Sequence, residues 1–109
     1  MKRSEHGLVE KIALKTVRTG SDKINFKILK MAERERERGT NIEDVIRETG
    51  LTKVPVNVRI NQLEKVDLVR RWRGTGLFVL TDLGKIFMNL VRRGEDMVRD
   101  RIMEMLMYD

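Results

Sequence analysis

The sequence predicts a mainly α-helical fold with one small β-hairpin, an extra N-terminal helix and a long C-terminal helix. Two observations lead to this fold class. Apolar residues recur at helical spacing in five segments, and the period changes to that of two short strands on either side of Gly74-Thr75-Gly76. A length of 109 residues suits one such domain. We therefore expect an N-terminal arm over residues 1–20, a central domain over 21–91 and a C-terminal helix over 92–109.

The first predicted helix covers residues 4–18. Ser4 is suited to cap it, because its hydroxyl can accept a hydrogen bond from the first turn, and Gly20 follows its end. The apolar residues of this helix fall on one stripe: Val9, Ile12, Ala13 and Val17. The sequence specifies no partner for the stripe, which leaves two alternatives, packing against a second copy of the chain or remaining mobile.

The second predicted helix begins after Ser21 or Asp22, either of which can cap it. It continues through a run of alternating Glu and Arg over residues 33–38 and stops at Gly39. The run places opposite charges at i,i+3 but like charges at i,i+4, so its effect on helix stability is mixed. We interpret it as a solvated helix end.

Two further helices come next, joined by a short turn. The helix over residues 42–49 has a cap residue on either side, Asn41 and Gly50, and the glycine suits a left-handed turn. Thr52 then caps a helix over residues 53–66. Two helices connected in this way form a helix-turn-helix candidate.

The helix over residues 53–66 has two different faces. At about 100° per residue, an apolar cluster spans about 60° of arc and must face the core: Val56, Ile60 and Leu63. Valines, amides and one lysine lie on the outward face and its flank: Val54, Asn57, Val58, Asn61 and Lys65. Amides can pair with adenine and valine methyls can contact thymine methyls, so this face suits a DNA major groove. The alternative is an ordinary exposed face or a protein-contact surface.

The predicted hairpin joins a strand over residues 68–73 to a strand over 77–80. Cations along it and its tip hydroxyl, with the lysine that starts the preceding helix, are candidates for phosphate contacts: Lys53, Arg70, Arg71, Arg73 and Thr75. Strand alternation puts Arg71 and Arg73 on one face and Arg70 and Trp72 on the other. We expect Trp72 to pack on the sheet, with stacking on a sugar or base as the alternative.

The last predicted helix follows Thr81, which caps it, and Gly94 is a place where this helix can bend or break. Beyond Gly94 an apolar stripe recurs at helical spacing: Met97, Val98, Ile102, Met105 and Leu106. Residues before Gly94 already complete the small core, so the stripe needs a partner, and we expect a two-fold homodimer. The alternative is that this segment folds back over the N-terminal helix.

The formal charge of +6 is concentrated in two places. Residues 1–20 carry five cations and two anions, residues 51–76 carry six and two, and residues 92–109 carry four and five. The remaining segments are neutral. A focused positive patch favours a polyanionic partner such as nucleic acid, and the alternative is a charge that only keeps the protein in solution.

Several function classes are excluded or disfavoured. The chain has no cysteine, which rules out disulfide frameworks and thiolate sites, and its single histidine is His6 in the N-terminal arm. No spacing typical of a metal site, a phosphate-binding glycine loop or a catalytic group occurs, so we expect neither an enzyme nor a bound metal or cofactor. No apolar run is long enough to span a membrane and no signal peptide is visible, so we expect a cytoplasmic protein.

The stretch from Leu51 to Gly84 resembles the winged-helix DNA-binding domain of archaeal and bacterial transcriptional regulators of the MarR and ArsR type. Four motifs carry the resemblance: Gly50-Leu51-Thr52, Leu63-Glu64, Leu68-Val69-Arg70-Arg71 and Leu80-Thr81-Asp82-Leu83-Gly84. Asp67 replaces the glycine usual before Leu68, and the hairpin is shorter than in many MarR-type proteins. With the preceding helices, the resemblance covers residues 21–91.

The resemblance implies a recognition helix over residues 53–66 and a wing over residues 70–79. It implies a double-stranded DNA-binding regulator of transcription, and we expect this regulator to act as a homodimeric repressor. Two other functions remain open, a winged-helix module that binds protein and a sequence-neutral architectural or RNA-binding protein.

Overall fold

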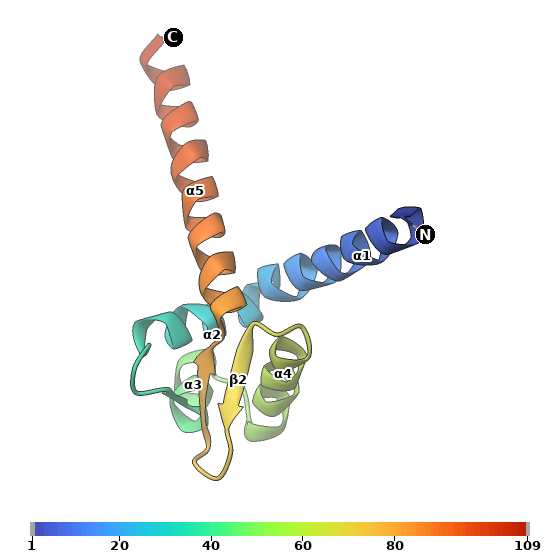
Figure 1. Cartoon of the computed structure of the whole chain (residues 1–109). Coiled ribbons are helices and arrows are strands. Elements are labelled where there is room, and N and C mark those ends of the chain that lie inside the picture. The colour runs from blue at the N-terminus through green and yellow to red at the C-terminus, as the bar shows by residue number, and fades with distance from the viewer. Residues whose placement is uncertain (1, 109) are drawn as a thin grey trace.

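The computed structural model describes the backbone of residues 2–108 and side chains over residues 7–107. This part of the chain forms five helices and a three-stranded antiparallel sheet (Figure 1). In chain order they are α1 (Lys2–Ser21), α2 (Lys23–Arg34), β1 (Thr40–Asn41), α3 (Ile42–Thr49), α4 (Lys53–Lys65), β2 (Val69–Trp72), β3 (Leu77–Leu80) and α5 (Asp82–Tyr108). The prediction of a mainly helical fold with a small hairpin is confirmed.

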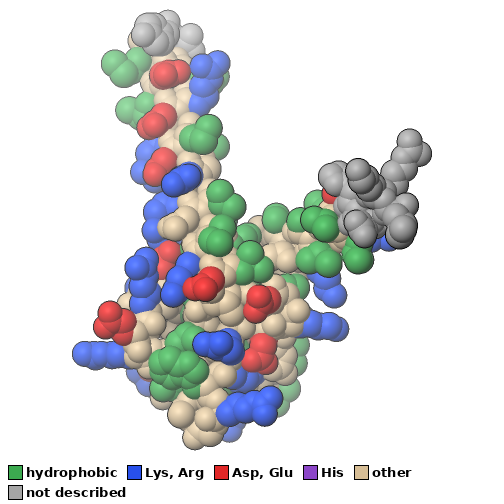
Figure 2. Space-filling view, in the orientation of Figure 1, with side chains coloured by type: hydrophobic (Ala, Val, Ile, Leu, Met, Phe, Trp, Pro, Cys, Tyr) green, Lys and Arg blue, Asp and Glu red, His purple; other side chains and the backbone are tan. Residues whose placement is uncertain are grey.

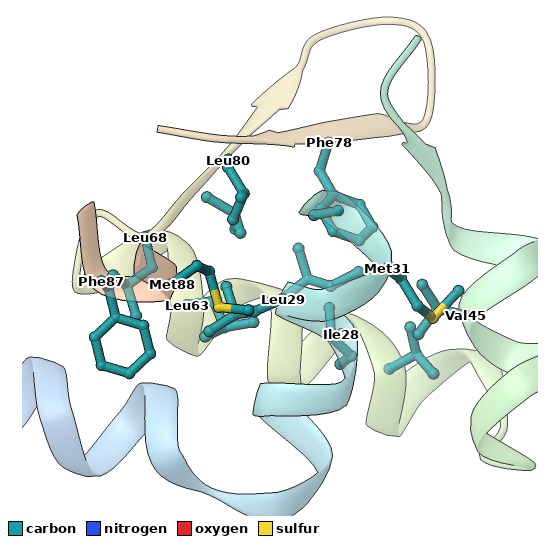
Figure 3. Packing of buried hydrophobic residues seen from close by; sticks show 14 residues of the cluster. Ile28, Leu29, Met31, Val45, Leu63, Leu68, Phe78, Leu80, Phe87 and Met88 are labelled. Carbon is teal, nitrogen blue, oxygen red and sulfur yellow. The ribbon is translucent and has the colours of Figure 1, made fainter. Parts of the chain in front are cut away.

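The hydrophobic core lies between helices α2–α4, the inner face of the sheet and the first turns of α5. Figure 3 shows Phe78 and Leu80 pointing from β3 toward α2, and Phe87 and Met88 closing the other end. The predicted inward face of α4 is confirmed, because its three apolar residues are fully buried: Val56, Ile60 and Leu63. Helix α1 adds no buried apolar side chain to this cluster among the residues described.

The first and last helices leave this core as two arms that point in different directions (Figure 1). Helix α1 begins at Lys2, so Ser4 lies inside it and is not its cap, and it continues to Ser21. Helix α5 passes through Gly94 as one continuous helix, so the break that Gly94 could have allowed does not occur. One glycine costs a helix about 1 kcal/mol, which its 27 residues can tolerate.

Helix α2 ends earlier than predicted. Its N-cap is Asp22, whose carboxylate accepts the backbone N–H groups of Ile24 and Asn25, both at 3.1 Å. Its last residue is Arg34, and residues 35–38 form an exposed turn. The apolar stripe that packs α2 against the core stops at Ala32. Like charges at i,i+4 destabilise a helix through the Glu/Arg run that follows.

The connection between α3 and α4 follows the prediction with one difference. Asn41 Oδ1 accepts the backbone N–H of Glu43 at 3.0 Å, and Gly50 ends α3 in the left-handed region with φ of 73°. Thr52 occupies the N-cap position of α4, but its side chain makes no capping hydrogen bond. The first turn of α4 is closed by the backbone bond from Val56 to the Thr52 carbonyl at 3.2 Å.

The C-terminus of α4 turns directly into the sheet. The backbone N–H groups of Asp67 and Leu68 donate to the carbonyls of Glu64 and Leu63 at 3.0 and 2.9 Å, a Schellman motif. Asp67 has φ of 63°, which explains why glycine is favoured at this position and why aspartate, which tolerates the left-handed region, is accepted. The following strand is therefore aimed back along α4.

The sheet contains a strand that the sequence did not predict. The order is β1-β3-β2, with Arg71 opposite Phe78 and Trp72 opposite Leu77 in the hairpin. On the other side of β3, Thr40 pairs with Phe78. This added strand has two residues, too few for any periodicity to show, and it holds the start of α3 against the sheet.

Gly84 sits where α5 passes closest to the sheet. A Cβ atom at this position would lie 2.1 Å from the backbone oxygen of Leu68. At Gly94, in the same helix, no atom lies within 4 Å of such a Cβ. The two glycines therefore differ in packing although both are helical.

We expect Gly84→Ala to lower the free energy of unfolding by about 3 kcal/mol, because the overlap is with backbone that cannot move aside. The matched variant Gly94→Ala should raise it by up to about 1 kcal/mol through helix propensity alone. Urea denaturation followed by circular dichroism measures both. Equal effects of the two substitutions would contradict this packing.

Candidate functional site

The outward face of α4 and the β2–β3 hairpin lie side by side and form one surface (Figure 1). On α4 the surface carries the predicted outward residues, of which Val54 is 73% and Val58 49% exposed. Lys53, Asn61 and Lys65 are also exposed on this helix. The structure therefore brings the residues predicted to read bases next to the hairpin predicted to contact phosphates.

One arginine of the hairpin fastens the sheet to α4. The Arg71 guanidinium donates from Nη2 to Asn61 Oδ1 at 2.8 Å, to Asn57 Oδ1 at 3.3 Å and to the Asn57 backbone oxygen at 3.4 Å. Glu64 accepts the backbone N–H of Arg71 at 3.1 Å, and its other oxygen lies 3.9 Å from Arg71 Nε. The Arg71 side chain is 26% exposed. It was expected to contact phosphate, but here it binds α4.

This network gives the two asparagines of α4 different chemistry. Asn57 uses both ends of its amide within the chain, because Oδ1 accepts from Arg71 and Nδ2 donates to the Lys53 carbonyl at 3.0 Å. Asn61 uses only Oδ1, and its Nδ2 donates to no residue in the described part of the chain. Asn61 therefore presents a fixed, available donor at the surface, whereas Asn57 has a positioning role.

Four further cations lie on α4 and the hairpin. Among the residues described, none of them forms an ion pair, and all are exposed: Lys53, Lys65, Arg70 and Arg73. Thr75 differs, because its hydroxyl donates to the Trp72 carbonyl at 2.7 Å and accepts the Leu77 N–H at 3.2 Å. The expected phosphate contact by Thr75 therefore competes with the turn that this side chain closes.

Trp72 lies on the outer face of the sheet, opposite Leu77. Its ring packs over Gly39, where a Cβ atom would come within 3.1 Å of it, and the residue is 37% exposed. This contact agrees with a packing role on the sheet. Figure 2 shows a hydrophobic patch at the lower front of the molecule with Lys and Arg side chains around it.

The end of α1 also lies beside α4, which the sequence did not predict. A hollow of about 580 Å³ between the two helices is lined in part by Arg18, Val58 and Lys65. Arg59 is not available there, because its Nη1 lies 2.5 Å from Oδ1 of Asp22, the carboxylate that caps α2. The excess charge of residues 1–20 was the signal in the sequence for this extension of the basic surface.

The residues predicted to mediate dimerisation project from α5 into solvent. Each is at least half exposed: Met97, Val98, Ile102, Met105 and Leu106. The apolar stripe on α1 is also exposed, and Val9 is 62% and Ile12 58% exposed. In the single chain, these two apolar faces have no covering partner among the described residues.

A second hollow, of about 820 Å³, lies between α2 and α5, and two ion pairs of the chain line it, Arg34 with Glu48 and Arg92 with Glu33. Over the described residues, no group of three His, Asp or Glu side chains is placed to hold a metal ion. No helix in the same part has the length and apolar character of a membrane span.

Comparisons with known proteins add no identification, since no protein-family model and no curated protein matches the chain.

We expect Arg71→Ala to lower the free energy of unfolding by about 1–2 kcal/mol, because it leaves the side chains of Asn61 and Glu64 without their half-buried partner. Arg70→Ala is the matched control on the next residue of the same strand, and should change stability by less than about 0.5 kcal/mol. Urea denaturation of both variants tests this. Indistinguishable midpoints would show that Arg71 does not fasten the hairpin.

Proposed function

We propose that this chain is a winged-helix protein that binds double-stranded DNA and regulates transcription as a homodimer. In this proposal α4 is the recognition helix in the major groove and the β2–β3 hairpin is the wing on the sugar–phosphate backbone. The observation that carries the proposal is the arrangement on α4 and the hairpin. The outward strip of α4 carries one fixed amide donor, the one acid of this helix, Glu64, is held by Arg71, and four cations of α4 and the hairpin form no ion pair among the residues described.

Base reading is assigned to the strip itself. The Nδ2 group of Asn61 can donate to N7 of a purine in the major groove, and Arg71 holds the amide in the orientation that this contact needs. Val54 and Val58 offer methyl groups that complement the C5-methyl group of thymine. Lys65, on the same face, is a candidate to donate to a guanine base. Asn57 supports this surface without donating to a base.

Backbone binding is assigned to Lys53, Arg70 and Arg73. Lys53 lies at the start of α4, where the positive end of the helix dipole also favours a phosphate. Arg70 and Arg73 lie on the wing, outside the network that Arg71 makes. Because these contacts are to phosphate, they give affinity and position rather than sequence preference.

Self-association is part of the proposal because the α5 stripe is uncovered. A two-fold dimer presents two copies of α4, which suits two half-sites about one helical turn of DNA apart. A bound dimer would cover DNA that a polymerase has to use. We therefore propose repression by occupancy as its regulatory action.

The affinity for a DNA duplex should fall steeply with salt. With three phosphate contacts per protomer, log affinity against log salt concentration has a slope of about −2.7 per protomer, and Arg73→Ala should make it shallower by about 0.9 for each protomer. Gel shifts on random-sequence duplex at several salt concentrations measure this. No binding at low salt would reject the proposal and favour the protein-binding alternative, in which Val54 and Val58 meet a protein.

Asn61→Ala should relax base preference at one position of the selected site, with a loss of about 1–3 kcal/mol of discrimination there. Asn89→Ala, an exposed asparagine on α5, is the matched control and should leave the selected sequence unchanged. Selection of binding sites from a random library measures both. If wild type selects no consensus at all, the protein is sequence-neutral and the architectural alternative holds.

A further inference from the structure

The outward strip of α4 has a second flank, on the side away from the hairpin. The side chains of α4 that contact the hairpin are Asn57, Asn61 and Glu64, and those that contact the start of α2 are Arg59 and Gln62. At about 100° per residue, the centres of these two groups lie about 160° apart around the helix. The strip to which base reading is assigned above lies between them.

Two side chains at the junction of α1 and α2 hold the end of α1 against this second flank. Asn25, a residue only 2% exposed, donates from Nδ2 to the Thr19 carbonyl of α1 at 3.0 Å, and the same nitrogen lies 3.5 Å from Gln62 Oε1 of α4. Asp22 caps α2 and accepts a hydrogen bond from Arg59 Nη1 of α4 at 2.5 Å. Because both contacts join the junction to α4, the last turns of α1 have a fixed position beside the strip.

Cations line the hollow of about 580 Å³ that lies on this flank. Lys15 and Arg18 line it from α1 and Lys65 from α4, and all three are exposed and form no ion pair among the described residues. Asp22 is the one carboxylate among the described residues that line the hollow, and Arg59 pairs with it. Figure 2 shows Lys and Arg side chains below the arm that α1 forms. The hollow is therefore suited to an anion.

The two cations of α1 lie on a different side of the helix from its apolar stripe. At about 100° per residue, Lys15 and Arg18 are roughly 170° from the centre of Val9, Ala13 and Val17. A partner that covers the stripe therefore leaves the two cations open. Self-association through α1 and the binding of an anion at its end do not compete for the same surface.

The dimensions of DNA identify the occupant of the second flank. A helix with its side chains is about 10–12 Å across, and the major groove is about 12 Å wide. A helix in the groove therefore has one sugar–phosphate backbone along each flank. When the hairpin of this chain lies on the backbone of one strand, the hollow faces the backbone of the other strand.

We infer that the end of α1 binds the phosphate backbone of the DNA strand across the major groove from the hairpin, through Lys15 and Arg18. The inference rests on the proposed function, because it takes α4 as the helix in the groove. It adds two phosphate contacts per protomer to the three assigned to Lys53, Arg70 and Arg73.

The salt dependence of duplex binding tests the inference. Five phosphate contacts give a slope of about −4.5 per protomer for log affinity against log salt, and Lys15→Ala/Arg18→Ala should return it to about −2.7. From about 50 to 200 mM salt, the wild type should then lose about twelvefold more affinity per protomer than the variant. Gel shifts on random-sequence duplex measure both proteins, and circular dichroism checks that both are folded.

Two further variants separate charge at this place from other effects. Lys23→Ala/Arg93→Ala removes the same charge from exposed positions outside the hollow and should keep the wild-type slope. Lys15→Arg/Arg18→Lys retains both charges in the hollow and should also keep it. A slope that becomes equally shallow in either of these variants would overturn the inference.

Interference by phosphate ethylation assigns the strand on a duplex that the wild type selects. The phosphates whose interference disappears in Lys15→Ala/Arg18→Ala should lie on the strand across the groove from those affected by Arg70→Ala/Arg73→Ala. Loss on the same strand as the hairpin variant would overturn the inference. If the wild type selects no sequence, the salt comparison decides alone.

The outcomes separate this inference from the proposed function. A wild-type chain that binds no duplex at low salt rejects both. A wild-type slope near −2.7 per protomer that Lys15→Ala/Arg18→Ala leaves unchanged overturns the inference alone, because the contacts assigned to the hairpin and to the start of α4 account for that slope.

Discussion

The candidate surface depends on how the hairpin is held against α4, and Arg71 supplies side-chain hydrogen bonds that join them. Its guanidinium reaches two asparagines and a glutamate of the helix, while its backbone N–H is bound by the same glutamate. A hydrogen bond from a charged donor is stronger than one between neutral groups. Because Arg71 contacts two amides and a carboxylate, it sets the orientation of the hairpin on α4 as well as its distance. The same arginine therefore fixes both the position of the hairpin and the orientation of the Asn61 amide.

The positive charge of the chain separates into groups with different surroundings. On the hairpin and α4, Arg59 and Arg71 are paired with acids of the chain, whereas four other cations form no ion pair among the residues described: Lys53, Lys65, Arg70 and Arg73. Around α2 and α3, arginines are paired within the chain, as Arg34 is with Glu48 and Arg59 with Asp22. On α1, Lys11 and Lys15 form no ion pair among the described residues. A net charge of +6 alone distinguishes none of these groups.

Local patterns predicted the elements that depend on local physics. The caps at Asn41 and Gly50, the buried face of α4 and the hairpin all follow from residue type and period, and the structure agrees with them. The two-residue strand β1 has no pattern of its own and forms only because β3 offers a free edge. The early end of α2 depends on where the core stops, a property of the tertiary structure.

The candidate site shows the same division. The faces of a helix and a strand placed Asn57, Asn61 and Arg71 near the site. They could not show which of these side chains would use its hydrogen-bonding groups within the chain. The Arg71 contacts span 7–14 residues of chain, and no periodicity reports on pairs at that separation. The same holds for Arg18, which comes close to α4 only through the packing of α1.

Leu68 links the roots of the two arms. The glycine near the end of α1 has room for no side chain against Phe87 and Leu68, and the glycine at the start of α5 lies against the Leu68 backbone. Leu68 itself is fully buried and follows directly on the turn that ends α4. The inclination of each arm is therefore set by its contact with Leu68, at the end of α4. A side chain added at either glycine would therefore displace an arm relative to α4, the helix that we propose to read DNA.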